Sequence, residues 1–302
     1  DSPMQSGFGR ISNQVFTRLV QRGHQVHVAS LLWDGIAVDG KDWFRPLKHE
    51  LPFQISGCAG RDIYSLVANL NNILEPDVIM SVQDFPYAHT VFYGCHIDWS
   101  RTGFCVVTPI DGEPILKDWL QLVDDADGTL VISQFGVDAM KRAGRRVGLC
   151  PPGIDHKYFT PASPEERLAL RQKAGIKPDA FVLGMMAMNQ GRKDIPHTLD
   201  GFWKFAIDKP NAFLLLDMDK VSPAGWNIPE LMETKGIPAS RVLFKDDIAK
   251  RGVSELRDRF SLLDAHSVLA HREGFGLPLV EGQSMGIPTI SLDWCSGTEI
   301  CG

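Results

Sequence analysis

A glycine-rich stretch with two glutamates at a fixed spacing is the part of this sequence best suited to chemistry. It covers residues 272–282 and reads Arg-Glu-Gly-Phe-Gly-Leu-Pro-Leu-Val-Glu-Gly, between two apolar runs. We expect a buried strand that ends near Ala270 and, after the glycine turn, a helix from Leu277 to about Met285. Gly286 then follows the helix end, where glycine is favoured. The unpaired N–H groups and the dipole at the start of such a helix are typical of a phosphate-binding site.

The two acidic side chains of the stretch favour a ligand that also carries hydroxyl groups. Glu273 precedes the predicted helix and Glu281 lies on its first face, so both carboxylates can reach one ligand. Because a carboxylate repels a phosphate, we expect these acids to bind the hydroxyls of a ribose or another sugar. The alternative is a plain strand–turn–helix connection with two solvated glutamates. The turn between the acids supplies backbone amides and an apolar lining through Gly274, Phe275, Gly276 and Leu277.

Two adjacent cations follow another predicted strand in the same half of the chain. Arg192 and Lys193 come shortly after the apolar run at 181–188. Arginine can hold two phosphate oxygens with its guanidinium fork, and lysine adds a mobile point charge. An Arg-Lys pair by itself is usually part of a solvated loop. Together with the glutamate stretch, however, this pair predicts a diphosphate site.

The first half of the chain holds two weaker candidates. Gly7 and Gly9 form a predicted glycine loop ahead of an amphipathic helix, although a plain tight turn explains them as well. Such a loop normally follows a strand, and that strand is expected upstream of the first residue. Asp111 and Glu113 stand in a polar turn after the predicted strand 104–108, at the end of a parallel strand where open α/β sheets bind ligands.

Alternating strands and helices in two α/β halves must position these residues. Two prolines and a glycine at Pro151–Gly153 indicate a stiff linker, so we predict domains at 1–150 and 151–302. Ser133 is expected to cap the helix that follows it, and segment 39–59 is interpreted as irregular. Strands are expected at 26–32, 77–82, 104–108, 128–132, 181–188, 212–216, 242–244, 266–270 and 287–292.

Length and composition indicate an ordinary globular chain of about two domains. The chain has 302 residues, of which 44% are hydrophobic and 23% charged. The net charge of −6 is spread over both halves, and no basic face argues for a nucleic-acid partner. No apolar run reaches the ~18 residues of a membrane span. The six cysteines lack any framework spacing and are expected to be free thiols in a reducing compartment, the cytoplasm.

The stretch at 272–282 resembles the E-x7-E signature of the family-4 retaining glycosyltransferases, which have the GT-B fold. The order Glu-Gly-Phe-Gly-Leu-Pro, then Glu, then Gly-Ile-Pro before an apolar strand is close to the pattern of that family. The resemblance implies two Rossmann-like domains that face each other across a cleft, the first on the acceptor side and the second binding the donor. It extends from Gly7 to Glu299. The chain is therefore expected to be truncated at both ends, with an incomplete donor domain.

The activity implied by this resemblance is that of a retaining, metal-independent glycosyltransferase of the hexosyltransferase type. It would move a sugar from a nucleoside-diphosphate sugar to an acceptor hydroxyl, with no cofactor, since the donor is a substrate. Whether Glu273 attacks the sugar or only orients it stays open. The implied catalytic residues are Glu273, Arg192, Lys193 and Asp111. The implied donor-binding residues are Gly7, Gly9, Arg192, Lys193, Gly274, Phe275, Gly276, Leu277 and Glu281.

Asp217 and Asp219 keep a rival interpretation open. They follow a buried run, and a D-x-D pair of this kind holds Mg²⁺ or Mn²⁺ in the other large glycosyltransferase fold, since hard oxygen ligands suit those ions. That fold has a single domain, whereas this chain has a linker and a cation pair that could replace the metal. We therefore predict that no metal is bound.

Other functions within the same fold are alternatives: a nucleotide-sugar epimerase, a phosphorylase, or an inactive nucleotide-sugar-binding protein. The acceptor is left open between a glycan, a lipid and a protein. A lipid-linked acceptor would bring the chain into peripheral contact with a membrane. We expect no nucleic-acid partner.

Overall fold

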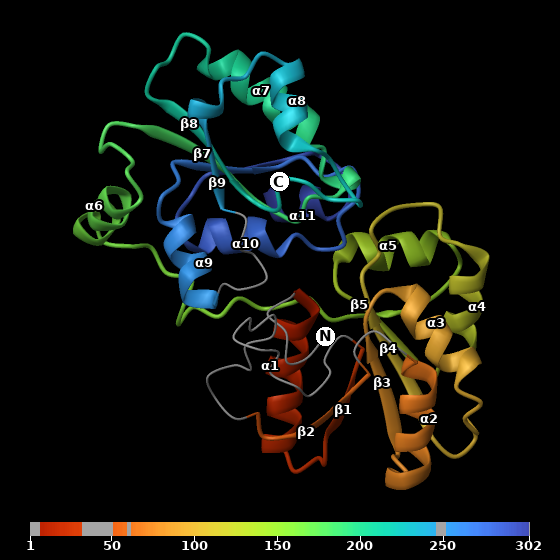
Figure 1. Ribbon diagram of the computed structural model, residues 1–302. Coiled ribbons are helices and arrows are strands. Elements are labelled where there is room, and N and C mark those ends of the chain that lie inside the picture. Colours follow the sequence, from red (N-terminus) through yellow and green to blue (C-terminus); the bar gives the residue numbers. More distant parts are fainter. Residues whose placement is uncertain (1–6, 32–50, 59–61, 246–251, 302) are drawn as a thin grey trace. The chain divides into compact units, whose positions relative to one another are not determined.

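The computed structural model describes residues 7–31, 51–58, 62–245 and 252–301, which fall into two compact units (Figure 1). Unit 1 is Asp1–Pro152 and unit 2 is Gly153–Gly302. Each unit is built of parallel strands connected by helices, as the alternating sequence pattern predicts. Within the described ranges, no helix is both long enough and apolar enough to cross a membrane.

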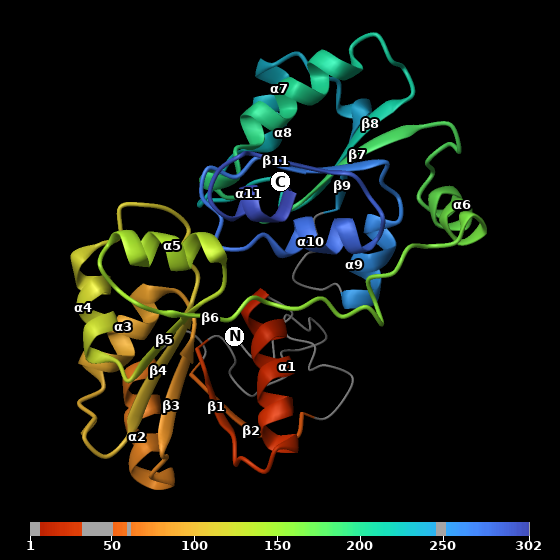
Figure 2. The same cartoon turned by 180° about the vertical axis from the view of Figure 1, so that it is seen from behind.

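The described part of unit 1 holds two parallel sheets. One pairs β1 (His27–Ser30) with β2 (Gln54–Gly57), and the other has the strand order β3–β4–β5–β6. Helices α3 and α4 pack on the larger sheet through one apolar cluster (Figure 2). The strands of that sheet are β3 (Val78–Val82), β4 (Gly103–Thr108), β5 (Gly128–Val131) and β6 (Gly148–Leu149). The helices are α1 (Gly7–Gln21), α2 (Ile63–Leu74), α3 (Phe85–Gly94), α4 (Lys117–Asp125) and α5 (Gln134–Arg142).

Strand β4 lies inside the larger sheet of unit 1 and leads to the turn that contains Asp111. Phe104 and Val106 are fully buried on one face of this strand, and Val107 on the other face is 7% exposed, as expected for a parallel strand covered on both faces. The helix that follows β5 is capped as predicted, because buried Ser133 accepts a hydrogen bond from the N–H of Gly136 at 3.2 Å.

The predicted glycine loop at Gly7 and Gly9 is wrong. Helix α1 already begins at Gly7, so both glycines lie in its first turn. A glycine costs a helix about 1 kcal/mol relative to alanine, and the fifteen-residue amphipathic helix outweighs this local preference.

Three short elements of unit 1 were not predicted: β2, α3 and the two-residue strand β6. Strand β2 lies inside segment 39–59, which the sequence indicates as irregular, because four residues carry little periodic signal. Helix α3 carries several aromatic residues that form no clear helical stripe. Residues 39–50, residue 59 and Leu32 at the end of the predicted strand 26–32 lie outside the described residues.

Unit 2 contains a five-stranded parallel sheet with helices on both faces. Its strand order is β11–β10–β7–β8–β9, and Figure 1 shows α7 and α8 on one face and α9 and α10 on the other. The strands are β7 (Phe181–Met186), β8 (Ala212–Asp217), β9 (Val242–Lys245), β10 (Ala265–Val268) and β11 (Thr289–Ser291). The helices are α6 (Pro164–Lys173), α7 (Ile195–Ala206), α8 (Ile228–Thr234), α9 (Val253–Phe260), α10 (Leu277–Ser284) and α11 (Ser296–Cys301). Two short 3₁₀ turns are η1 (Gly191–Lys193) and η2 (Ala239–Arg241).

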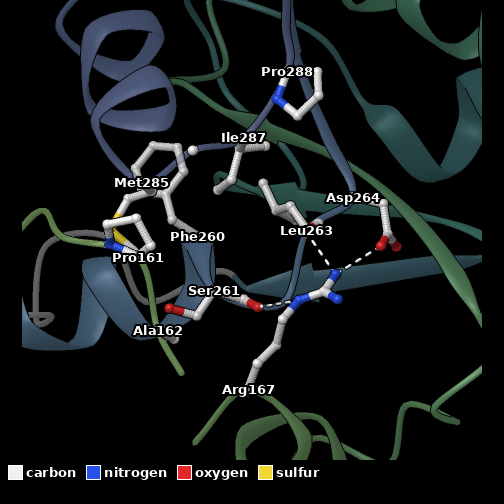
Figure 3. Close-up of a pocket in the computed structure, with 11 residues that line it drawn as sticks. Pro161, Ala162, Arg167, Phe260, Ser261, Leu263, Asp264, Met285, Ile287 and Pro288 are labelled. Atoms are coloured by element: carbon white, nitrogen blue, oxygen red, sulfur yellow. Dashed lines mark hydrogen bonds and ion pairs between the residues drawn. The ribbon is translucent and has the colours of Figure 1, made fainter. Parts of the chain in front are cut away.

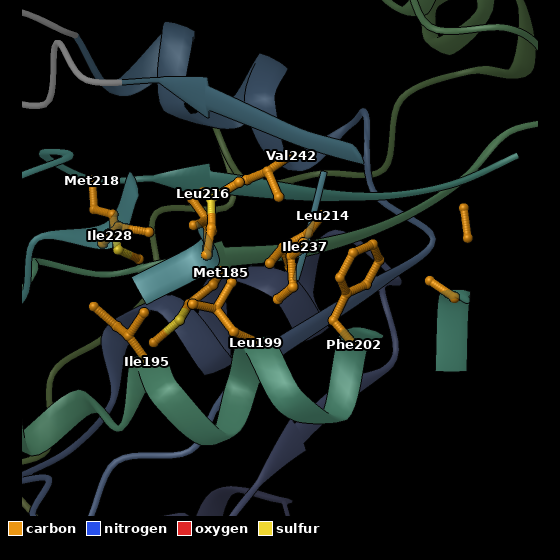
Figure 4. Packing of buried hydrophobic residues seen from close by; sticks show 13 residues of the cluster. Met185, Ile195, Leu199, Phe202, Leu214, Leu216, Met218, Ile228, Ile237 and Val242 are labelled. Atoms are coloured by element: carbon orange, nitrogen blue, oxygen red, sulfur yellow. The ribbon is translucent and has the colours of Figure 1, made fainter. Parts of the chain in front are cut away.

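Successive leucines of β8 fill the cores on the two faces of this sheet. Leu214 and Leu216 are fully buried in one cluster, together with Leu199 of α7 (Figure 4). Leu215 is fully buried in the other cluster, together with Phe260 of α9. Side chains alternate across a strand, so a continuous apolar run needs cover on both faces.

The strand order of unit 2 reverses between β7 and β10. This reversal marks the carboxyl ends of these two strands as the expected place for a ligand. After β7 the chain adds β8 and β9 on one side, and it then adds β10 and β11 on the other side. In open α/β sheets, ligands bind beyond the carboxyl ends of the strands at such a reversal. The segments that leave β7 and β10 at these ends are 187–194 and 269–276. They contain the predicted cation pair and the predicted glycine turn.

Buried His266 in β10 makes the stability of unit 2 depend on pH. Its side chain is 0% exposed and its Nε2 accepts a hydrogen bond from the N–H of Met186 at 3.2 Å. Burial lowers the pKa of His266 from 6.5 to about 3. Below pH 6.5 the unfolded chain binds a proton that the folded chain does not, so stability is highest above this pH and falls with acidification. By about pH 5 the loss should reach about 2 kcal/mol.

We expect the His266→Gln variant to lose less stability than the parent chain between about pH 7.5 and about pH 5. Glutamine keeps an acceptor for the Met186 N–H but does not titrate in this range. Urea unfolding of both proteins at the two pH values measures the difference. Equal losses in parent and variant would show that His266 is not the group responsible.

Candidate functional site

The turns after β7 and β10 meet through a set of charged contacts. The ammonium of Lys193 donates a hydrogen bond to the carboxylate of Glu273. Arg192 Nη1 donates to the carbonyl oxygen of Arg272 at 2.6 Å and lies 3.5 Å from Glu273 Oε2. The N–H of His271 donates in turn to the carbonyl oxygen of Arg192 at 2.8 Å. The structure therefore brings the predicted cations and the first predicted glutamate together at the reversal of the sheet.

A buried asparagine holds the turn that carries Arg192 and Lys193, here called the cation turn, in place. Asn189 is 3% exposed, and its Nδ2 donates to the carbonyl oxygens of Asp219 and Trp226 at 3.0 and 2.8 Å. The N–H of Trp226 donates back to Asn189 Oδ1 at 2.9 Å. A Cβ on Gly225 would lie 2.1 Å from Asn189 Oδ1, so this close approach requires glycine. These bonds join the start of η1 to the loop after β8.

The glycine turn leads into helix α10 as the sequence predicts. The helix runs from Leu277 to Ser284, and Gly286 beyond it has a φ of 74°. Gly276, at the N-cap, has a φ of 90°, in the left-handed region where glycine is favoured. The hydroxyl of Ser296 donates to the carbonyl oxygen of Glu273 at 2.8 Å. The turn is thus tied to α11 as well as to the cations.

The Gly276→Ala variant is expected to be less stable than the parent by about 1–3 kcal/mol. A Cβ at this position would lie 3.1 Å from Leu279 Cδ1, and the positive φ adds strain. Gly201→Ala is the matched control. Gly201 lies in α7, and among the described residues outside that helix no atom would lie within 4 Å of a Cβ there. The control should be neutral or stabilising. Chemical denaturation measures both changes, and equal effects would contradict the strained turn.

The electrostatics of the site favour an anion. Lys193 and Glu273 have side chains that are 8% and 14% exposed, and Arg192 is 35% exposed. Two cations share one carboxylate in this half-buried place, next to the N-terminus of α10, where the helix dipole adds partial positive charge. A phosphate group arriving there would meet donors held in advance by the fold.

The second predicted glutamate lies deeper in the unit. Glu281 is in the second turn of α10 and is 1% exposed. Gly274 is buried, and Phe275 and Leu277 are half-buried. The two glutamates therefore belong to one turn–helix unit, Glu273 before the helix and Glu281 inside it.

The two aspartates of the rival D-x-D interpretation lie in different environments. Asp217 is 0% exposed and pairs with buried Arg259, with Arg259 Nη1 2.7 Å from Asp217 Oδ1. Asp219 is exposed. The carboxylate of Asp217 is thus engaged in a buried ion pair of the fold.

The predicted residues of the first half all lie in unit 1. Asp111 is half-buried in the turn after β4. Glu113 in the same turn accepts two hydrogen bonds from Arg142 of α5, at 3.0 and 2.7 Å, so this carboxylate has a structural partner. Gly7 and Gly9 lie in α1.

Three further polar residues flank the cation turn, and sequence reasoning gave them no role in the site. Asp194 directly follows η1, and His197 Nδ1 lies 2.7 Å from its Oδ1. His271 Nε2 lies 3.0 Å from Asp194 Oδ2. The position of His271 after a strand end was the available signal, but residue spacing alone does not show that His271 meets Asp194.

A pocket of about 280 Å³ lies at the other end of the unit 2 strands, near the amino ends of β10 and β11 (Figure 3). Phe260 and Met285 contribute to its apolar lining, and Arg167 pairs there with Asp264 at 2.6 Å. Burial alone would raise the pKa of the Asp264 carboxyl, but hydrogen bonds from Arg167, the Val182 N–H and Arg171 hold this pKa below its usual value. These polar groups bond to one another and to the backbone, which is typical of structural support.

No protein-family model matches the chain. In sequence it is similar to the D-inositol 3-phosphate glycosyltransferase of Stackebrandtia nassauensis, with 29% identity over 163 residues, 51% of this chain and 35% of that protein. The protein of the same name from Actinosynnema mirum is 28% identical over 185 residues, 57% of this chain and 42% of that protein. The chain spans less than half the length of these relatives.

Solved structures with a similar fold include Anabaena Alr3699/HepE in complex with UDP and glucose. The TM-score is 0.76 at 17% identity, over 99% of this chain and 80% of that one. Sucrose-phosphate synthase from Thermosynechococcus elongatus gives a TM-score of 0.73 at 14% identity, over 95% and 75% of the two chains. WaaG, a glycosyltransferase involved in lipopolysaccharide biosynthesis, gives 0.70 at 16% identity, over 98% and 80%. The chain has the GT-B fold, as its resemblance implies, and its sequence relatives are named as glycosyltransferases.

Proposed function

We propose that this chain transfers a sugar from a nucleoside-diphosphate sugar to an acceptor hydroxyl, with retention of configuration and without a metal ion. Unit 2 would bind the donor. The GT-B fold, the glycosyltransferase relatives and the UDP-bound structural neighbour support this proposal. The free state of all six cysteines is in keeping with a cytoplasmic enzyme.

The observation that carries the proposal is the meeting of two cations with the glycine turn before α10. Arg192 and Lys193 leave β7, Glu273 leaves β10, and both segments end at the reversal of the sheet. This is the place where an α/β sheet binds a phosphorylated ligand. The arrangement supplies two positive side chains and a helix N-terminus to one diphosphate.

In the proposed mechanism, the donor diphosphate accepts hydrogen bonds from Arg192 and Lys193 and from the amides at the start of α10. Negative charge builds on the diphosphate as the bond to the sugar breaks, and groups that are fixed in advance stabilise it most effectively. Glu281 would accept hydrogen bonds from the ribose hydroxyls. Glu273 would contact the sugar, either as a nucleophile or by orienting it.

The acceptor would be bound by unit 1, where Asp111 stands beyond the carboxyl end of β4. A hydroxyl that attacks a sugar must lose its proton, and a carboxylate near the acceptor can take it. The acceptor is a glycan, a lipid-linked group or a protein. A lipid-linked acceptor would place the chain at a membrane surface.

The test is incubation of the chain with UDP-, GDP- and ADP-sugars labelled in the sugar, with a panel of acceptor hydroxyls. Sugar transfer, or slow hydrolysis of one donor, supports the proposal, and NMR of the product reports the anomeric configuration. An isomerised nucleotide sugar would indicate an epimerase instead. Transfer of the sugar to inorganic phosphate would indicate a phosphorylase. Binding of a donor without turnover would indicate an inactive nucleotide-sugar-binding protein.

Removal of metal ions is expected to leave the transfer rate unchanged. In the proposed mechanism Arg192 and Lys193 offset the charge of the diphosphate, the task that a divalent ion performs in metal-dependent enzymes. Initial rates before and after treatment with EDTA measure the effect. A rate abolished by EDTA and restored by Mg²⁺ or Mn²⁺ would contradict metal independence.

A further inference from the structure

Three side chains beside the cation turn bring atoms of the kind that bind metal ions close together. Asp194 follows η1, His197 lies one turn later in α7, and His271 follows β10. Their ligand atoms lie within 4.8 Å of one another. Two segments that are far apart in the sequence thus contribute two imidazoles and one carboxylate to a single place.

The fold fixes the carboxylate and leaves the imidazoles accessible. The Asp194 side chain is 10% exposed, whereas those of His197 and His271 are 71% and 60% exposed. The Asp194 carboxylate makes no capping bond to α7, so it is not needed to begin the helix. The backbone N–H of Thr198 and that of His271 are bonded to Asp194 O and Arg192 O, at 3.2 and 2.8 Å, which holds both segments in place.

This donor set indicates the class of ion. Imidazole nitrogen together with one carboxylate oxygen suits Zn²⁺ and the other divalent ions of the first transition row. Mg²⁺ and Ca²⁺ prefer sites made of oxygen ligands. Three protein ligands leave the remaining coordination positions to water, and the exposed imidazoles provide an entry path.

We propose that Asp194, His197 and His271 bind one divalent transition-metal ion at the rim of the cation turn. The ion would connect the turn that carries Arg192 and Lys193 to the segment that leads into Glu273. It would take no part in sugar transfer, so the site is separate from the proposed function and from the D-x-D pair.

The experiment is a calorimetric titration of the chain with ZnCl₂, together with the absorption spectrum of the Co²⁺-loaded chain. We expect one ion per chain, and a Co²⁺ spectrum with bands typical of nitrogen and oxygen ligands. His197→Ala and His271→Ala should each weaken Zn²⁺ binding by about tenfold or more, since even residues that only orient metal ligands contribute that much. Zn²⁺ should also raise the Tm of the parent chain, but not that of the variants.

The matched control is the double variant His24→Ala/His96→Ala, which removes two exposed histidines outside the cluster. It should bind Zn²⁺ like the parent. Absence of binding in the parent overturns the proposal and leaves the three side chains as a hydrogen-bonded link. Binding that survives His197→Ala and His271→Ala, or that is lost in the control, also overturns it. None of these measurements depends on a sugar donor.

Discussion

Replacing Lys193 by methionine is expected to lower the turnover number for donor consumption by roughly a hundred- to a thousandfold, the usual effect of losing one charge-stabilising contact. The Lys193 side chain is 8% exposed and contacts Glu273. Methionine keeps most of the apolar stem, but it is one atom shorter and lacks the charge and the hydrogen-bond donors of the ammonium. The charge is needed most when the diphosphate departs, so we expect kcat to fall more than KM rises. Steady-state kinetics with the best donor measure both quantities.

The control for this variant is Lys209→Met, at a lysine that is 47% exposed and pairs with Asp208 on the surface. It should turn over the donor at the parent rate. The exposed Lys209 pair contributes about 1 kcal/mol or less, so Lys209→Met should melt like the parent. Melting curves of both variants show whether the fold is kept. A Lys193→Met variant that is folded and fully active would refute the assignment of the diphosphate to this turn.

Replacing Arg259 by methionine is expected to lower the free energy of unfolding by about 3–5 kcal/mol. The Arg259 and Asp217 side chains are 5% and 0% exposed, and their nearest charged atoms are 2.7 Å apart. Without the guanidinium, a buried carboxylate loses its charged partner. Urea denaturation measures the loss. The double variant Asp217→Leu/Arg259→Met should recover much of it, since an apolar pair needs no compensating charge.

A surface pair provides the comparison for Arg259→Met. Arg145 and Asp124 lie 2.6 Å apart, but their side chains are 34% and 42% exposed. Arg145→Met should therefore change stability by about 1 kcal/mol or less. The same series tests the rival metal interpretation. Loss of activity in Asp217→Asn at unchanged stability would assign this residue to a metal ion, whereas loss of stability assigns it to the core.

Much of the fold could be predicted from periodicity and turn residues. The apolar run at 212–216 predicted β8, and the glycine turn together with Gly286 predicted the bounds of α10. The prediction was wrong at Gly7, because a long amphipathic helix overrode the local preference of glycine. It missed β2, since four residues carry too little pattern. In each case the outcome depended on packing that a short sequence window does not contain.

The sequence by itself determined the alternation of elements and the kinds of side chain that follow the strands of unit 2, because helix and strand periods and turn chemistry are local properties. Only the tertiary structure decided which charged groups meet. Lys193 and Glu273 are 80 residues apart, and Arg259 and Asp217 are 42 residues apart. Such contacts follow from strand order and from burial. The placement of β10 beside β7 turns two separate polar segments into one site, and burial turns Asp217 from an apparent metal ligand into half of an ion pair.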